Sequence, residues 1–141
     1  MTRGFNPGLG LAFLRVVVGI IFAAHGVPKL AGGIEATATF FGSLGIPAPT
    51  FAAWAIAVLE TAGGLLLVVG FLVVPVALLL VIHMTVGIFL VHLPNGFYVI
   101  GSGQEGIEFN LLLIAALVAL VFAGPGAGAL DARRGGEAIT A

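Results

Sequence analysis

The chain has 141 residues, of which 60% are hydrophobic and only 8% are charged, and its mean hydropathy is +1.24. A soluble domain carries about 25% charged residues, so this composition excludes an ordinary soluble domain and a disordered chain. The net charge of −1 speaks against a nucleic-acid-binding surface, and the lack of cysteine excludes disulfides, thiolate metal sites and a dithiol relay within these residues.

The first predicted membrane span covers residues 9–30. A transmembrane helix needs about 20 mostly apolar residues, and this run carries Arg15 near its start and His25 and Lys29 near its end. Its length and the lack of a small-residue cleavage signal favour a permanent span over a removed signal peptide. We expect Arg15 to reach out to the nearby membrane surface. Residues 31–50, with several glycines and prolines, are expected to form a connector that can hold a short interfacial helix.

Three more apolar runs predict spans over residues 51–72, 74–93 and 107–123. Backbone polar groups in the hydrocarbon core must be satisfied internally, so all four runs should be helices. The short link between the second and third runs makes these two antiparallel neighbours. The predicted fold is therefore all-α, an integral membrane four-helix bundle over residues 1–131, followed by a flexible C-terminal tail, 132–141.

Lysine and arginine near the ends of the spans predict the orientation. Arg3 and Arg15 lie on the N-terminal side and Arg133 and Arg134 in the tail, whereas the opposite side has Lys29 alone. Both termini should therefore face the cytoplasm, with the chain in the cell (inner) membrane and its surroundings the lipid bilayer.

Two ionisable side chains are predicted near the middle of the membrane. Glu60 and His83 lie at similar depth in neighbouring antiparallel spans, so we expect a hydrogen bond between them. Such a pair is either a polar clamp that fixes the bundle or a site that carries protons or contacts a ligand. Gly63 and Gly64 follow Glu60 and are interpreted chiefly as helix-packing residues.

A second polar group is predicted at the outer mouth of the bundle. His25 and Lys29 share a helix face one turn apart, and the ends of the third and fourth spans and the loop between them complete the group. Its members are His25, Lys29, His92, Asn95, Glu105 and Glu108. The alternatives are snorkelling for Lys29 and a favourable helix N-terminus for Glu108. Neither haem nor a metal ion is favoured, because the histidines come from separate runs without ligand spacing.

Four short motifs then resemble the DoxX family of small membrane proteins. They are HGVPKL at 25–30, ETAGG at 60–64, HLPNGF at 92–97 and GIEF at 106–109, in the order and spacing typical of that family, and the ending 124–131 also fits. The resemblance implies a four-helix integral membrane protein. It also implies a redox setting, because relatives include quinone-linked subunits of thiosulfate:quinone oxidoreductase. Other relatives are thought to join a superoxide dismutase and a sulfurtransferase in a membrane assembly that detoxifies oxidants.

The leading hypothesis is a membrane subunit of such a redox system, either a quinone-linked oxidoreductase or a complex that counters oxidative or thiol stress. Electrons would come from a partner, so the chain would be a subunit rather than a complete enzyme. We expect catalytic roles for His25, Lys29, Glu60, His83, His92 and Glu108, and contacts to a quinone cofactor from His25, Lys29, His92, Asn95 and Glu108, with no metal ligand. Two alternatives stay open: a small proton-coupled transporter or channel, built as a homo-oligomer around Glu60, and a non-catalytic scaffold that docks soluble redox partners.

Overall fold

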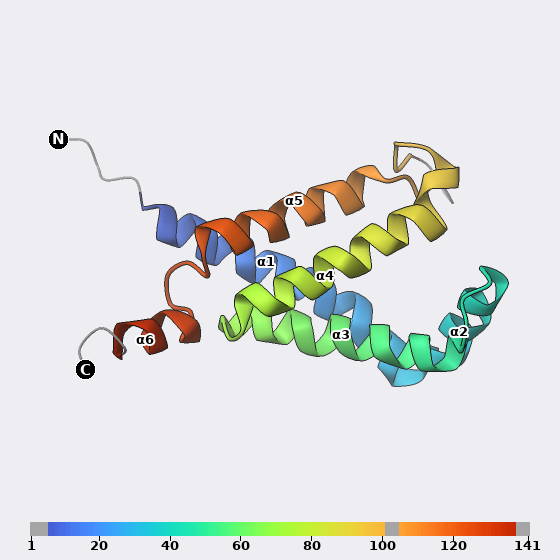
Figure 1. Cartoon of the computed structure of the whole chain (residues 1–141), viewed down its shortest axis with the longest axis horizontal. Helices are drawn as coiled ribbons and strands as arrows, with labels where there is room; N and C mark the ends of the chain where they lie inside the picture. The colour runs from blue at the N-terminus through green and yellow to red at the C-terminus, as the bar shows by residue number, and fades with distance from the viewer. Residues whose placement is uncertain (1–5, 101–104, 138–141) are drawn as a thin grey trace.

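Four long helices run antiparallel along one axis in the computed structural model, which describes residues 6–100 and 105–137 (Figure 1). No strand occurs in those two ranges. The helices are α1 (Pro7–Pro28), α2 (Ile34–Ser43), α3 (Pro49–Val69), α4 (Val73–Gly87), α5 (Glu108–Ala123) and α6 (Leu130–Glu137). A π-helical turn, Lys29–Gly33, joins α1 to α2, and α4 continues through a second π-helical turn, Ile88–His92, into a short 3₁₀ turn, Leu93–Asn95.

The predicted four-helix membrane bundle is confirmed. Three helical stretches are long and apolar enough to cross a membrane, Pro7–Ser43, Pro49–Val69 and Val73–Asn95, and Glu108–Ala123 is a shorter apolar helix beside them. Large apolar side chains cover the outside of the bundle, as expected where lipid rather than water is the neighbour. The most exposed of them are Phe13, Phe51, Phe89, Leu112 and Phe122.

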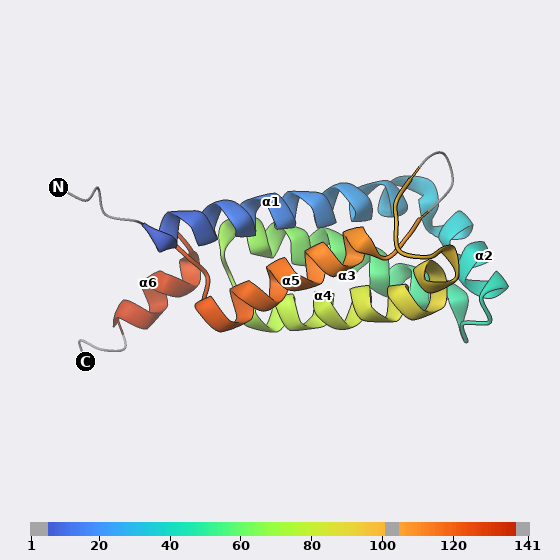
Figure 2. The same cartoon turned by 90° about the horizontal axis from the view of Figure 1, so that it is seen from above.

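The bundle has two different ends. Both described termini lie at one end, which we call the terminus end, and α2 lies at the other, the α2 end (Figures 1 and 2). The expected short helix in the connector is present as α2. The arrangement agrees with the prediction that both termini share one side of the membrane. Which side faces the cytoplasm stays a prediction, and Arg3, which contributed to it, lies outside the described residues.

Helices α1 and α3 make the closest helix pair of the bundle. A Cβ added to Gly19 would lie 2.6 Å from the carbonyl oxygen of Gly64, and one added to Gly64 would lie 2.5 Å from the carbonyl oxygen of Gly19. Small residues allow backbones to approach in this way, and packing at close range is the main attraction between helices in lipid. Gly63 faces Val76 of α4 instead. Gly63 and Gly64 therefore both serve helix packing, as the sequence predicted.

The terminus half of the bundle is filled by apolar side chains. Helices α3, α4 and α5 each contribute fully buried residues, namely Leu67, Val73, Leu80, Leu117 and Leu120. Such dense filling leaves this half without room for a ligand. The large cavity of the bundle lies toward the α2 end instead.

The terminus end is closed by the segment that follows α5. Nη2 of Arg15 donates a hydrogen bond to the carbonyl oxygen of Ala127 at 3.4 Å, and Arg15 is only 3% exposed. The expectation that Arg15 reaches the membrane surface is therefore wrong, because the returning chain covers it. Within the predicted tail, 132–141, residues up to Glu137 are helical and continue α6, and 138–141 lie outside the described residues.

Two predicted span boundaries shift by a few residues for local reasons. Helix α3 ends at Val69 rather than at residue 72, because Gly70 takes a left-handed conformation with φ of 75°. Leu72 follows in the same region with φ of 53°, which a non-glycine residue rarely adopts. The next helix begins at Val73, so the turn between α3 and α4 is tight and holds them antiparallel.

Candidate functional site

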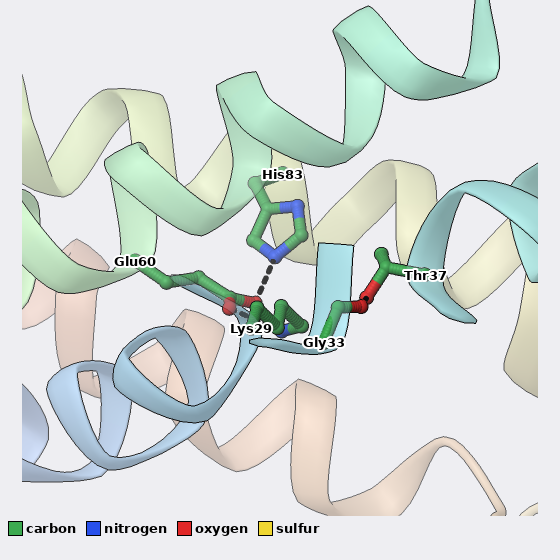
Figure 3. A network of polar contacts seen from close by, with 5 residues as sticks. All are labelled: Lys29, Gly33, Thr37, Glu60 and His83. Carbon is green, nitrogen blue, oxygen red and sulfur yellow. Dashed lines mark hydrogen bonds and ion pairs between the residues drawn. The ribbon is translucent and has the colours of Figure 1, made fainter. Parts of the chain in front are cut away.

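Lys29, Glu60 and His83 form a polar cluster inside the bundle, with one residue from each of three helical segments (Figure 3). Nζ of Lys29 donates to Oε2 of Glu60. Nε2 of His83 lies 3.0 Å from Oε1 of the same carboxylate. A carboxylate only accepts hydrogen bonds, so the His83 proton in this contact sits on Nε2. Both oxygens of Glu60 are thus paired, which a carboxylate with 6% exposure requires.

The expected contact between Glu60 and His83 is present, whereas the third partner differs from expectation. Lys29 was predicted at the outer mouth and instead turns inward to Glu60. Two local features bring it there. A Cβ on Gly26 would lie only 2.9 Å from Cβ of Glu60, so α1 runs unusually close to α3 at this level. Lys29 follows three residues later, just before the chain kinks at Gly32.

The cluster borders a cavity of about 880 Å³ at the α2 end. The cavity lies among α1, α2, α3, α4 and α5, and its walls are mostly apolar. Apolar lining residues include Phe22, Phe40, Phe41, Ile56, Met84 and Phe109. The polar residues that line it are His25, Lys29, Thr37, Glu60, His83, His92, Glu105 and Asn110. Mostly apolar walls with a few polar groups are typical of sites for small molecules and cofactors.

His92 lines the same cavity from the second π-helical turn. Its Nδ1 lies 2.7 Å from the backbone carbonyl oxygen of Glu105. A carbonyl can only accept, so Nδ1 carries a proton. In the neutral ring, Nε2 is then a hydrogen-bond acceptor that remains available. The loop therefore fixes which nitrogen His92 can offer to a ligand.

His25 also lines the cavity, but it is among the exposed residues of α1. It lies one turn before Lys29 on the same face, as predicted. Its ring makes no hydrogen bond to any residue in 6–100 or 105–137. His25 is thus available to a ligand or to solvent at the edge of the cavity.

Asn95 and Glu108 lie at the α2 end, as their depth predicted, but their side chains make other contacts. Glu108 lies in a separate, smaller hollow, and its Oε1 accepts a hydrogen bond from the backbone N–H of Val99 at 2.7 Å. Nδ2 of Asn95 donates to the carbonyl oxygen of Val91 at 3.1 Å. Glu108 thus pairs with the chain after the 3₁₀ turn, and Asn95 pairs with the turn just before it. Neither lines the large cavity.

Asn110 is the lining residue that sequence reasoning missed. It lies on α5, is 4% exposed and borders the cavity. The signal was available, since a carboxamide within the apolar run 107–123 is as unusual as a charge. Among the residues that the structure describes, no group of three or more His, Cys, Asp or Glu side chains could hold a metal ion.

Comparison with known proteins agrees with this architecture. A profile of the DoxX family matches residues 10–93. The chain is 37% identical to "Putative oxidoreductase CatD" of Bacillus subtilis (strain 168), over 93% of this chain and 90% of that protein. It is 33% identical to "Inner membrane protein YphA" of Escherichia coli (strain K12), over 87% of this chain and 89% of that protein. No solved structure matches the chain. The chain is therefore a member of the DoxX family and a multi-pass integral membrane protein.

Proposed function

We propose that this protein is a quinone-binding membrane subunit of a redox system in the cell inner membrane. The observation that carries the proposal is the cavity at the α2 end, in which a hydrogen-bonded Lys29–Glu60–His83 cluster meets apolar walls. The names of two relatives support the setting, because one is called a putative oxidoreductase and the other an inner membrane protein.

The residues around the cavity fit a quinone in size and in chemistry. Its volume of about 880 Å³ lies within the range of roughly 300–1,000 Å³ that is usual for small-molecule sites. Phe22, Phe41 and Phe109 supply apolar surface for a ring and a hydrocarbon tail. Lys29 donates one N–H to Glu60 and has further N–H groups to offer to a ring oxygen. A ligand that is soluble in lipid could reach such a site from the bilayer.

The polar cluster offers acid–base groups next to the proposed ring. A bound quinone supplies two-electron redox chemistry, since uptake of two electrons and two protons gives the quinol. Lys29 would orient a ring oxygen through Nζ. Glu60, which contacts both Lys29 and His83, would hold or accept a proton at Oε1 or Oε2, and His83 would exchange it at Nε2. These roles explain why three ionisable groups are kept together inside a membrane.

Electrons would be exchanged with a partner, because the chain has no cysteine with which to form a dithiol relay. A soluble electron donor or acceptor that docks at a membrane surface is the class of partner that this requires. The superoxide dismutase and sulfurtransferase implied by the family resemblance belong to the same proposal.

A second candidate function is proton-coupled transport through Glu60. The packing favours it less, because the described part of the bundle between Glu60 and the terminus end is filled by side chains such as Leu67, Leu80 and Leu117, which are fully buried. A transporter would need a second conformation that opens this half. Proton flux into liposomes that is lost in Glu60→Gln would favour transport over redox chemistry.

The proposal is tested by measuring quinone that co-purifies with the protein in a mild detergent. We expect close to one quinone per chain in the wild type and at least a fivefold loss in Lys29→Met. The matched pair Glu60→Gln and Glu35→Gln makes the same chemical change inside and outside the cavity, since Glu35 is exposed on α2. Loss in the first and retention in the second supports the site. Equal quinone in all variants, or none in the folded wild type, would overturn it.

A further inference from the structure

Asn110 has an environment that its burial alone does not explain. The residue is 4% exposed, it borders the cavity, and its side chain makes no hydrogen bond to any residue in the described ranges. Its side-chain polar atoms are not fully enclosed by protein and border the cavity, where an amide inside a membrane span needs a hydrogen-bond partner. An apolar residue at this position of α5 would suit the bundle better. The carboxamide is therefore best explained by a partner that enters the cavity.

Gly87 and His92 of the α4 segment lie beside Asn110. A Cβ added to Gly87 would lie 3.7 Å from Nδ2 of Asn110 and 4.0 Å from Cδ2 of His92. Cδ2 is bonded to Nε2, so the ring edge of His92 that remains free of the loop is the one nearest to Gly87. Gly87 itself borders the cavity. Because it has no side chain, the amide and the imidazole edge share one open space.

Asn110 and His92 lie beside Gly87, about one turn of α4 beyond His83. Gly87 follows His83 by four residues in α4, which corresponds to about 6 Å along the helix at 1.5 Å per residue. The cavity thus offers Lys29 and His83 at one level, and Asn110 and His92 one turn nearer the α2 end. A flat six-membered ring with an oxygen at each of two opposite ends would span these levels.

We propose that Asn110 and His92 form a second polar anchor, which makes the site selective for ring ligands with two opposed oxygens over lipids with a single polar head. The inference rests on the proposed function and deepens it by naming the residues that hold the second ring oxygen. Asn110 can donate through Nδ2 to a carbonyl or accept through Oδ1 from a hydroxyl. His92 Nε2 accepts from a hydroxyl when the ring is neutral. The pair therefore suits both the oxidised and the reduced form of such a ring.

The test compares two probes in equilibrium binding to the purified protein in detergent: decylubiquinone, with two opposed ring oxygens, and 4-decylphenol, with one. We expect the wild type to prefer decylubiquinone by at least tenfold. Asn110→Leu should weaken decylubiquinone binding about tenfold, leave 4-decylphenol binding within twofold, and keep or raise the unfolding temperature. Asn6→Leu makes the same change at the terminus end, away from the cavity, and should leave both affinities unchanged.

Comparing Lys29→Met with Asn110→Leu distinguishes failure of the second anchor from failure of the quinone site itself. If decylubiquinone binding falls in Lys29→Met but not in Asn110→Leu, the second anchor is wrong while the quinone site stands. If the wild type binds no decylubiquinone, both are wrong. An equal loss for both probes in Asn110→Leu would indicate a packing role and overturn the anchor. Gly87→Ala is a second variant that the fold tolerates, since its Cβ makes only ordinary contacts, and it should lower decylubiquinone affinity by crowding Asn110.

Discussion

The carboxylate of Asp131 caps helix α4 at its first residue, Val73, from 58 positions further along the chain. Oδ2 accepts a hydrogen bond from the backbone N–H of Val73 at 2.8 Å, and Oδ1 accepts one from Leu72 at 3.0 Å. A carboxylate at this place satisfies two free N–H groups of the helix and meets the positive end of its dipole. It also supports Leu72 in its left-handed conformation.

Asp131→Ala is expected to lower the free energy of unfolding by about 1–2 kcal/mol, which is the usual cost of losing a helix cap. Asp131→Asn keeps an acceptor oxygen and should lose less than half of that. Reversible unfolding in mixed detergent micelles measures both. Wild-type stability in Asp131→Ala would show that the closing segment does not hold α4 in solution.

The crossing of α1 and α3 depends on two glycines in mutual contact. Gly64→Ala is expected to cost about 2 kcal/mol, because a new methyl group would meet the backbone of α1 and force the helices apart. Gly10→Ala in α1 is the matched control, since no atom lies within 4 Å of a Cβ added there. It should stabilise the protein by about 0.5–1 kcal/mol through helix propensity. The same loss in both variants would contradict the close crossing.

The ion pair between Lys29 and Glu60 should appear as a coupling in a double-mutant cycle. Lys29→Met and Glu60→Leu each leave one ionisable partner in the bundle without its counterion, which we expect to destabilise the fold by about 3 kcal/mol. The double variant removes both and should lose at least about 1 kcal/mol less than the sum. Strictly additive losses of unfolding free energy would mean that the two side chains do not interact.

The bend between α1 and α2 depends on Gly32, whose φ of 142° suits glycine alone. Gly32→Ala meets no atom within 4 Å, so its cost is purely conformational, and we expect about 1–3 kcal/mol. Gly42→Ala, in the regular part of α2, makes only ordinary contacts and should cost less than 0.5 kcal/mol. Thermal unfolding followed by circular dichroism compares the two. Equal melting temperatures would show that α2 can leave α1 at another angle.

The spans could be predicted because hydropathy alone determines where a chain can cross a membrane. The contact of Glu60 with His83 followed from the same reasoning, since a short link makes α3 and α4 antiparallel and sets the depth of both side chains. These predictions needed only the chain order and helix geometry.

The other partners in the site depend on features that hydropathy does not report. Lys29 turns inward because Gly26 brings α1 against α3 just before the chain kinks at Gly32, and neither feature changes the apolar pattern. Glu108 turns away because a loop amide at Val99 needs an acceptor. Arg15 is covered by a segment more than a hundred residues away. Such long-range contacts are not encoded in the local pattern of the sequence.

The most direct test of the cavity as a quinone site is photolabelling of the protein in bilayers with an azidoquinone, followed by mapping of the labelled peptides. The cavity predicts labels at lining residues such as Ile56, Met84 and Phe109, with at least fivefold loss in Lys29→Met or under excess decylubiquinone. Labels confined to lipid-facing residues such as Phe13 and Phe122, and insensitive to competitor, would contradict it.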